Sequence, residues 1–207
     1  MKLLSLIFAF GLSLVTSAAL ALEAGKEYVA LSPMQPASVK KGQIEVLEFF
    51  WYRCPHCFHL EHDFEAWAKK QPKHVVIKRV PAILNSGWDV LAKAYYALEA
   101  LGLHDKLHDD LFKAIHVQGM DMTTEQMFFD WAVTKGVDRT KLVDAYNSFG
   151  VDSKTMRAQQ LGRDYKLSGV PAIAINGKYV TNVGMAGSQP ALFKVVDELI
   201  AQERNRK

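Results

Sequence analysis

Cysteine is the residue that this chain has least of: its 207 residues include only two, Cys54 and Cys57. A small exported domain that depends on disulfides for stability carries an even set of cysteines at scattered positions. Here only two residues separate the pair, and a disulfide across so short a loop restricts the unfolded chain very little. The scarcity and the spacing therefore argue against a framework of structural disulfides, with a single inert disulfide left as an alternative.

An excess of charge of one sign is also lacking. The chain has 25 Lys and Arg against 22 Asp and Glu, a formal net charge of +3. So small a difference gives no electrostatic reason to expect a lipid surface as a partner, and we expect no nucleic-acid partner. Internal repeats and low-complexity tracts are absent as well, whereas 49% of the residues are hydrophobic, which is enough to build one good-sized core.

A long hydrophobic run occurs only at the amino terminus. Lys2 precedes an uncharged apolar run over residues 3–15, and small residues that end in Ala19-Leu20-Ala21 follow this run. The run is shorter than the roughly 20 residues that cross a bilayer, so a membrane anchor is the weaker alternative. The pattern predicts a secretory signal peptide over residues 1–21, with cleavage after Ala21.

The segments around the two cysteines predict a strand, a helix and a second strand. Residues 44–50 are nearly all apolar, which is typical of a strand buried on both faces. The cysteine pair follows almost directly, and apolar residues between 58 and 68 then recur at helical spacing. Residues 75–80 have the composition of a strand, so the three segments form a unit with a right-handed crossover. The cysteines are therefore expected where a strand turns into a helix.

The rest of the chain predicts helices, then a hairpin, then a last helix. Strand composition returns at 172–175 and 179–181, on either side of Asn176-Gly177, which is typical of a tight turn. A last amphipathic helix is predicted over 192–200. Between the two strand regions, apolar residues recur at helical spacing in five stretches: 90–101, 107–115, 127–131, 142–149 and 158–165.

These patterns predict an α/β protein in which an all-helical segment interrupts a sheet domain. We assign residues 22–80 and 166–207 to the sheet domain, because strand patterns occur only there. Residues 81–165 form the helical insertion between its two halves.

The tetrapeptide Cys54-Pro55-His56-Cys57 places two thiols one helical turn apart at the start of a predicted helix. The unpaired N–H groups and the positive end of the helix dipole stabilise a thiolate at Cys54. Pro55 suits the first turn because the N–H that proline lacks would have no partner there. His56 can donate a hydrogen bond or a positive charge to the thiolate. We therefore expect Cys54 to be the exposed, acidic sulfur and Cys57 the more buried one.

A stabilised thiolate sets the direction of the redox chemistry. Each pKa unit is worth about 1.4 kcal/mol, or about 30 mV in a two-electron couple, and it favours the reduced dithiol. A disulfide between Cys54 and Cys57 thus becomes easier to reduce. This direction suits a disulfide that is passed on to another molecule rather than one that is withdrawn from it.

A metal site is the main alternative use of the two cysteines. His59 and His62 could complete a set of zinc ligands, but a zinc site with this cysteine spacing normally recruits distant ligands. Attachment of c-type haem requires His directly after the second cysteine, where this chain has Phe58. We therefore expect no metal and no other cofactor. A further group at helical spacing is interpreted as a solvated charged face: His104, Asp105, His108 and Asp109.

A carboxylate in the buried strand is the other anomaly. Glu48 shares a strand face with Ile44, Val46 and Phe50, so an ionised side chain there is costly unless it is paired or protonated. We interpret Glu48 as a buried proton acceptor beneath the cysteine pair, coupled to Lys78 on the next strand. The alternative is that this end of the strand is exposed and that both side chains are solvated.

Two motifs give the chain a recognisable likeness. Glu48-Phe49-Phe50 stands just ahead of the Cys-Pro-His-Cys tetrapeptide, and Gly169-Val170-Pro171 follows the helical insertion. With these two motifs the chain resembles the DsbA family of periplasmic disulfide-donating enzymes. The resemblance extends from about Glu27 to the last helix. The resemblance implies a thioredoxin-like fold with an inserted all-helical domain. It also implies that Pro171 is a cis proline packed against the cysteine pair, with the Val170 backbone pairing with a substrate strand.

The resemblance further implies an activity, partners and a location. It implies a thiol-disulfide oxidoreductase that donates the Cys54–Cys57 disulfide to reduced or unfolded exported proteins through a mixed disulfide. A DsbB-like membrane oxidase would reoxidise the enzyme, which would be a periplasmic monomer without a cofactor. Glu48 and Lys78 would be its buried charged pair, although Arg79 stands next to Lys78 and leaves the partner of Glu48 open. Two alternative functions remain. One is a reductase or disulfide isomerase with the same fold, and the other is a metal-binding module.

Overall fold

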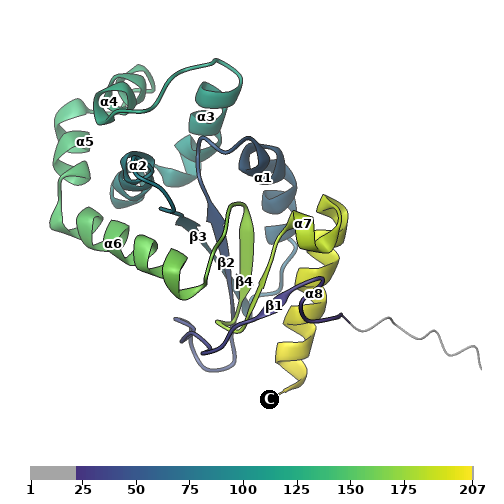
Figure 1. Ribbon diagram of the computed structural model, residues 1–207. Helices are drawn as coiled ribbons and strands as arrows, with labels where there is room; N and C mark the ends of the chain where they lie inside the picture. Colours follow the sequence, from purple (N-terminus) through teal and green to yellow (C-terminus); the bar gives the residue numbers. More distant parts are fainter. Residues whose placement is uncertain (1–21, 207) are drawn as a thin grey trace, which may run out of the picture.

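A five-stranded sheet forms the centre of the molecule in the computed structural model, which describes residues 22–206 (Figure 1). The predicted signal peptide over residues 1–21 lies outside this range. The strand order is β1-β5-β4-β2-β3, with β2 parallel to β3 and every other neighbouring pair antiparallel. The strands are β1 (Val29–Ala30), β2 (Ile44–Phe50), β3 (Val75–Pro81), β4 (Ala172–Ile175) and β5 (Tyr179–Thr181).

Strand β2 is central because it is buried along its whole length, as its apolar composition predicts. Its neighbours β3 and β4 cover both of its edges. The four longer strands confirm the predicted strands. Strand β1 was not predicted, because two residues are too few to form an alternating pattern.

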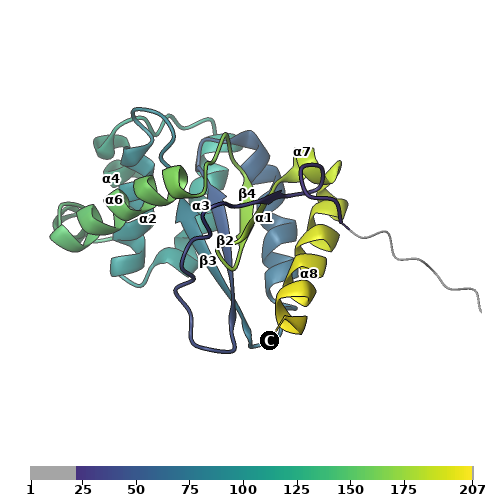
Figure 2. The ribbon, with the colours of Figure 1, turned by 60° about the horizontal axis from the view of Figure 1, so that its bottom comes forward.

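Helices cover both faces of the sheet, as Figures 1 and 2 show. One face carries α1 (Pro55–Ala68), the short α7 (Val183–Ala186) and α8 (Gln189–Asn205). The other face carries the helical insertion. Its members are α2 (Asp89–Ala100), α3 (His104–His116), α4 (Glu125–Thr134), α5 (Arg139–Tyr146) and α6 (Phe149–Asp164). No helix within residues 22–206 is long and apolar enough to cross a membrane.

Alternate residues of β2 face two separate cores. Ile44 and Val46 pack with apolar residues of α1 and α8, whereas Leu47 and Phe49 pack with the helical insertion. This follows from the two-residue period of a strand, which sends successive side chains to opposite faces. The same rule decides which charged residues of β2 and β3 can meet.

One predicted helix is in fact two. The periodic stretch over residues 142–149 crosses the end of α5 at Tyr146 and the start of α6 at Phe149. Ser148 caps α6 by accepting a hydrogen bond from the backbone N–H of Val151, at 3.3 Å. A serine in this position ends one helix and starts another even though the apolar spacing continues.

The Asn176-Gly177 turn joins β4 to β5 as predicted. Both residues have positive φ, 51° and 67°, which is the conformation that Asn and Gly adopt most readily. Gly177 is required for a second reason, because a Cβ there would collide with the backbone carbonyl of Gln35. The turn thus fixes the register of the strand that follows Pro171.

Candidate active site

The two cysteines lie where β2 runs into α1, as predicted. Cys54 is the N-cap of α1: its backbone N–H donates to the Trp51 carbonyl at 2.9 Å, and its Sγ accepts from the Cys57 backbone N–H at 3.4 Å. Pro55 is the first residue of the helix, where its missing N–H leaves no unpaired donor. Both thiols are free, so the structure represents the reduced form.

The two sulfurs have opposite electrostatic environments. The pKa of Cys54 is lowered to about 6, first by the hydrogen bond from the Cys57 thiol and further by the backbone N–H groups of Cys57 and His56 and the charge of His56, against partial burial. Burial, above all, raises the pKa of Cys57 well above its usual range. One correction concerns exposure: Cys54 was expected to be exposed but is only 7% exposed, against 1% for Cys57. Cys54 is more exposed than Cys57, as predicted, but both residues are buried.

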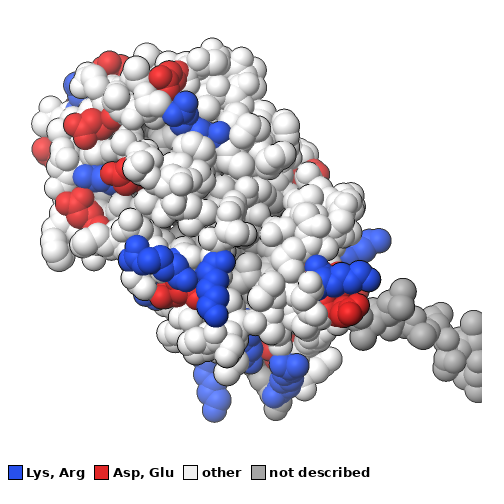
Figure 3. Space-filling view, in the orientation of Figure 1, with Lys and Arg blue, Asp and Glu red and all other residues white. Residues whose placement is uncertain are grey.

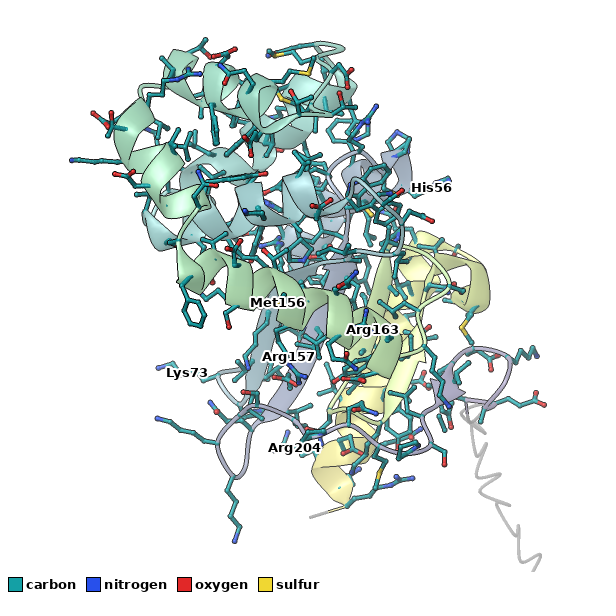
Figure 4. The ribbon with its side chains drawn as sticks, turned by 60° about the vertical axis from the view of Figure 1, so that its left-hand side comes forward. His56, Lys73, Met156, Arg157, Arg163 and Arg204 are labelled. Carbon is teal, nitrogen blue, oxygen red and sulfur yellow. The ribbon has the colours of Figure 1, made fainter. Side chains whose placement is uncertain are left out.

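His56 projects from the surface beside the buried pair. Its side chain is exposed and lies at the upper right in Figure 4, whereas Lys73 and Arg204 lie in the lower part of that view. On the face drawn in Figure 3, acidic and basic residues are interspersed over the helical insertion, and most of the surface is uncharged. The charge that acts on Cys54 is therefore local, from His56 and from the start of α1.

The loop before β4 comes to within contact of the first cysteine. The Val170–Pro171 peptide bond is cis, as the resemblance implies, and the Val170 carbonyl oxygen lies 3.4 Å from Cys54 Sγ. Val170 is half-buried, whereas Pro171 is buried. Residues far apart in the sequence thus meet at one sulfur.

Aromatic side chains flank the cysteine pair. Trp51 stacks on Trp88 with ring centroids 3.9 Å apart and an interplanar angle of 6°. On the other side, Phe58 stacks on His116, whose Nε2 donates to the Tyr52 carbonyl at 2.8 Å. The stacking partners Trp88 and His116 both come from the helical insertion or its edge, so the insertion supports the strand-to-helix junction.

Glu48 is fully buried, as its place in β2 predicts, and it binds Arg79. The Arg79 Nε donates to Glu48 Oε2 at 3.0 Å, and its Nη2 donates to Glu61 Oε1 at 2.7 Å and to Glu65 Oε2 at 2.8 Å. We call these four residues the Arg79 cluster. Burial and then the charge of Glu61 raise the pKa of Glu48 to about 8, although Arg79 opposes this.

The predicted pairing of Glu48 with Lys78 is wrong. Lys78 Nζ donates to Glu45 Oε1 at 2.7 Å and to the Ser38 carbonyl at 2.6 Å. The register explains this: Glu48 lies opposite Arg79, and Lys78 lies opposite Leu47. Because neighbouring residues of a strand face opposite sides, Lys78 points towards the insertion and Arg79 towards α1.

Three members of the site were missed in the sequence: Glu61, Glu65 and His108. Glu61 follows Cys57 by one helical turn, so the buried face of α1 could have indicated it. His108 was expected on a solvated charged face, but it is only 4% exposed. Its Nδ1 lies 2.7 Å from the Tyr52 hydroxyl, and its Nε2 lies 3.3 Å from Glu61 Oε2. The sequence did contain a signal for this burial: His108 lies three residues before Leu111, so it falls within the apolar period of α3.

No group of three or more His, Cys, Asp or Glu side chains within residues 22–206 is arranged to hold a metal ion. His59 and His62 are both exposed and make no contact with the sulfurs. The thiols and carboxyls of the site can support thiolate attack, thiolate departure and proton transfer.

Comparisons with known proteins point to one family. Residues 75–194 match the family described as DSBA-like thioredoxin domain. The "Thiol:disulfide interchange protein DsbA" of Burkholderia cepacia is 40% identical over 205 residues, covering 99% of this chain and 96% of its own. The protein of the same name in Pseudomonas aeruginosa is 39% identical over 181 residues, covering 87% of this chain and 85% of its own.

Solved structures agree with the sequence comparisons. The crystal structure of Pseudomonas aeruginosa DsbA superposes with a TM-score of 0.85 at 38% identity, covering 89% of this chain and 96% of that one. The oxidoreductase DsbA from Xylella fastidiosa superposes with a TM-score of 0.83 at 29% identity, covering 89% of this chain and 98% of that one. The sheet with its helical insertion is thus the architecture of these proteins.

Proposed function

The chain belongs to the DsbA family as a disulfide-forming oxidoreductase with the pair Cys54–Cys57, and from this premise we propose that it donates that disulfide to newly exported proteins in the periplasm. The observation that carries the proposal is the asymmetry of the two sulfurs. Cys54 has a lowered pKa, whereas Cys57 is almost completely buried and has a raised one.

This asymmetry makes the enzyme an oxidant. At neutral pH the reduced enzyme holds Cys54 as a thiolate, and this stabilises the dithiol relative to the disulfide. A low cysteine pKa is an established property of this family, so the direction agrees with that of its relatives. The enzyme therefore gives up its disulfide readily to a client whose cysteines are reduced.

The donation proceeds in two exchanges. A client thiolate attacks Cys54 Sγ, the Cys54–Cys57 bond breaks, and Cys57 leaves as a thiolate. Glu48, whose charge acts on Cys57 and which is protonated at neutral pH, gives its proton to that thiolate, so in this step it is a proton donor rather than the acceptor expected from the sequence. A second client thiolate then attacks the client sulfur of the mixed disulfide, and Cys54 leaves as a stable thiolate. The client gains a disulfide, and the enzyme takes up the two electrons as a dithiol.

The client is held beside Cys54 by backbone contacts. The Val170 carbonyl lies 3.4 Å from Cys54 Sγ, and the residue precedes the cis proline at the start of β4. An extended client segment that pairs with the Val170 backbone would lay its cysteine against Cys54. Pairing through main-chain hydrogen bonds does not require a particular client side chain, which suits an enzyme that acts on many clients.

The cycle closes when the dithiol is oxidised again. We assign this step to a DsbB-like membrane oxidase that passes the electrons to a quinone. The soluble enzyme then works as a monomer and needs no cofactor of its own, since both electrons travel through the two sulfurs.

The redox equilibrium with glutathione tests the proposal directly. We expect an equilibrium strongly on the side of the reduced enzyme, and rapid net oxidation of a reduced, unfolded client by stoichiometric oxidised enzyme. The C54S variant is the control, because it lacks the sulfur that is attacked. Shuffling of client disulfides without net oxidation would support an isomerase instead, and an equilibrium like that of an ordinary dithiol would contradict the donor role.

A further inference from the structure

A histidine of the helical insertion reaches the Arg79 cluster from the side opposite to β2. His108 lies on α3, and its ring fits between the Tyr52 hydroxyl at 2.7 Å and Glu61 Oε2 at 3.3 Å. Apart from this 3.3 Å approach, neither His108 Nε2 nor Glu61 Oε2 has a polar partner in residues 22–206, and the approach is a close contact rather than a well-aligned hydrogen bond.

The surroundings fix which ring nitrogen carries the proton. Burial lowers the pKa of His108, so its ring is neutral at neutral pH and has one N–H. A proton on Nε2 faces the Glu61 carboxylate, and it leaves Nδ1 free to accept from the Tyr52 hydroxyl. The charged or titratable groups that face His108 come from every neighbouring element: Tyr52, Glu61, Glu65, Arg79, Tyr95 and His104.

The Arg79 cluster holds too little positive charge for its carboxyls. Glu65 is partly exposed and also pairs with Lys69 at 3.1 Å, so it is neutralised from the surface. Glu48 and Glu61 are buried and share the single charge of Arg79. One of these two buried carboxyls must therefore keep a proton.

The hydrogen-bond donors decide which carboxyl keeps it. Glu48 receives one donor on Oε2, from Arg79, and its Oε1 has no partner among the described residues. Glu61 receives the Arg79 Nη2 on one oxygen and faces the His108 Nε2 with the other. Donors to a carboxylate favour its charged form, so Glu61 ionises and the proton stays on Glu48.

We propose that His108 is a positioning residue that keeps the shared proton on Glu48 by holding Glu61 ionised. The inference rests on the proposed role of Glu48 as the proton donor to the departing Cys57 thiolate. In that step the proton moves from the Glu48 carboxyl to Cys57 Sγ, which leaves Glu48 as a carboxylate. The helical insertion, through one side chain, thus prepares the thioredoxin-like half for the exchange.

The proton that Glu48 loses can be replaced from solvent. A cleft of about 650 Å³ lies between α1 and α3, and Glu61, Arg79 and His108 line it, whereas Glu48 does not. Of the two buried carboxyls, Glu61 is therefore the one that borders the cleft. A proton taken up at Glu61 can return to Glu48 because both carboxyls bind Arg79, and Glu61 is then again the carboxylate that His108 favours.

Three variants test the proposal in the full-length enzyme. H108F removes the donor and keeps a ring among the neighbouring rings Phe50, Tyr95 and Phe112. H108Q retains an N–H that can reach Glu61 but cannot titrate. H104F is the matched control, because His104 lies one turn earlier with its ring centroid 4.8 Å from that of His108, and it makes no contact with Glu61.

The direct readout is the titration of the two carboxyls by ¹³C NMR in reduced enzyme with labelled glutamate. In H108F we expect the pKa of Glu48 to fall by about one pH unit, because Glu48 no longer keeps the shared proton as firmly. Reduction of the oxidised enzyme by dithiothreitol at neutral pH should slow roughly tenfold, as expected when proton donation is impaired. H108Q and H104F should stay close to the wild type in both measurements.

The outcome separates this proposal from the proposed function. A folded H108F variant in which Glu48 keeps its pKa overturns the role of His108, even if the glutathione equilibrium still shows a strong oxidant. If H108F does not fold, Y52F removes only the hydroxyl that fixes the tautomer and should shift Glu48 in the same direction by less. The ¹⁵N spectrum of the wild type gives an independent check, and a ring with its proton on Nδ1 would also overturn the proposal.

Discussion

Two ion pairs lie on opposite faces of β2 and β3, and they have different roles. On the insertion side, Lys78 binds Glu45, and its side chain is 38% exposed. On the α1 side, Arg79 binds Glu48, and its side chain is 16% exposed. Lys78 and Arg79 are consecutive residues, so the alternation of the strand alone assigns one to a partly solvated pair and the other to the buried Arg79 cluster.

The comparison shows how a short segment can carry both stability and chemistry. The pair of Lys78 is anchored to a backbone carbonyl and reaches water, which makes it an ordinary contact that holds the loop at Ser38. The pair of Arg79 has two buried carboxyls for one positive charge, so a proton has to be stored there. Only the second arrangement is useful next to sulfurs that exchange a proton.

The largest expected effect comes from removing each cation in turn. R79M leaves two buried carboxyls without their shared charge, and we expect it to lower the free energy of unfolding by about 3–5 kcal/mol. K78M leaves only one buried carboxyl, Glu45, which keeps the Ser38 backbone N–H as a donor at 3.2 Å, and the Lys78 charge that is lost is partly screened by solvent, so we expect a smaller cost of about 1–2 kcal/mol. Urea denaturation of both reduced variants measures the difference. Equal losses would mean that the two pairs are equivalent after all.

The second prediction concerns pH. In the unfolded chain Glu48 ionises near its ordinary value of 4.5, whereas in the folded enzyme burial keeps it protonated up to about pH 8. The folded state therefore loses stability as the pH rises through this window, by up to about 1.4 kcal/mol per pH unit. E48Q cannot ionise, so its free energy of unfolding relative to the wild type should increase by about 1–3 kcal/mol from pH 5 to pH 8.

The control for this prediction lies on the opposite face of the same strand. E45Q weakens the hydrogen bond from Lys78, and Glu45, unlike Glu48, does not share its cation with a second buried carboxyl. The E45Q variant should therefore be no more stable than the wild type at either pH. Urea denaturation of the wild type, E48Q and E45Q at the two pH values measures the differences. A constant difference between E48Q and the wild type would contradict the raised pKa of Glu48. E48Q should also slow the departure of Cys57.

Much of this arrangement could be predicted from the sequence because it depends on local patterns. The run over 44–50 indicates a buried strand by composition alone, and its two-residue period places Glu48 inside. The position of the cysteines at a helix start follows from the strand that precedes them and the helical spacing that follows. Asn176-Gly177 indicates its turn through the conformations that these two residues allow.

The partner of Glu48 and the burial of His108 were not predicted, because both depend on how distant segments of the chain align, and no local pattern fixes this alignment. Whether Lys78 or Arg79 meets Glu48 is decided by the register of β3, which depends on how the chain returns after α1. The burial of His108 depends on which face of α3 packs on α1, and a helical period leaves the edges of that face undefined. Both omissions concern long-range packing, and both fall in the Arg79 cluster and its neighbours.

The smallest expected effect extends the comparison from the carboxyls to the sulfurs. The charge of His56 is the weakest of the influences that lower the pKa of Cys54, behind the Cys57 thiol and the backbone N–H groups. H56A should therefore raise that pKa by less than one unit and make the enzyme less oxidising by less than about 30 mV. H59A, also exposed and one turn further along α1, is the control. Thiolate absorbance and the glutathione equilibrium measure both quantities, and an unchanged potential in H56A would leave the start of α1 and Cys57 as the whole source of the oxidising power.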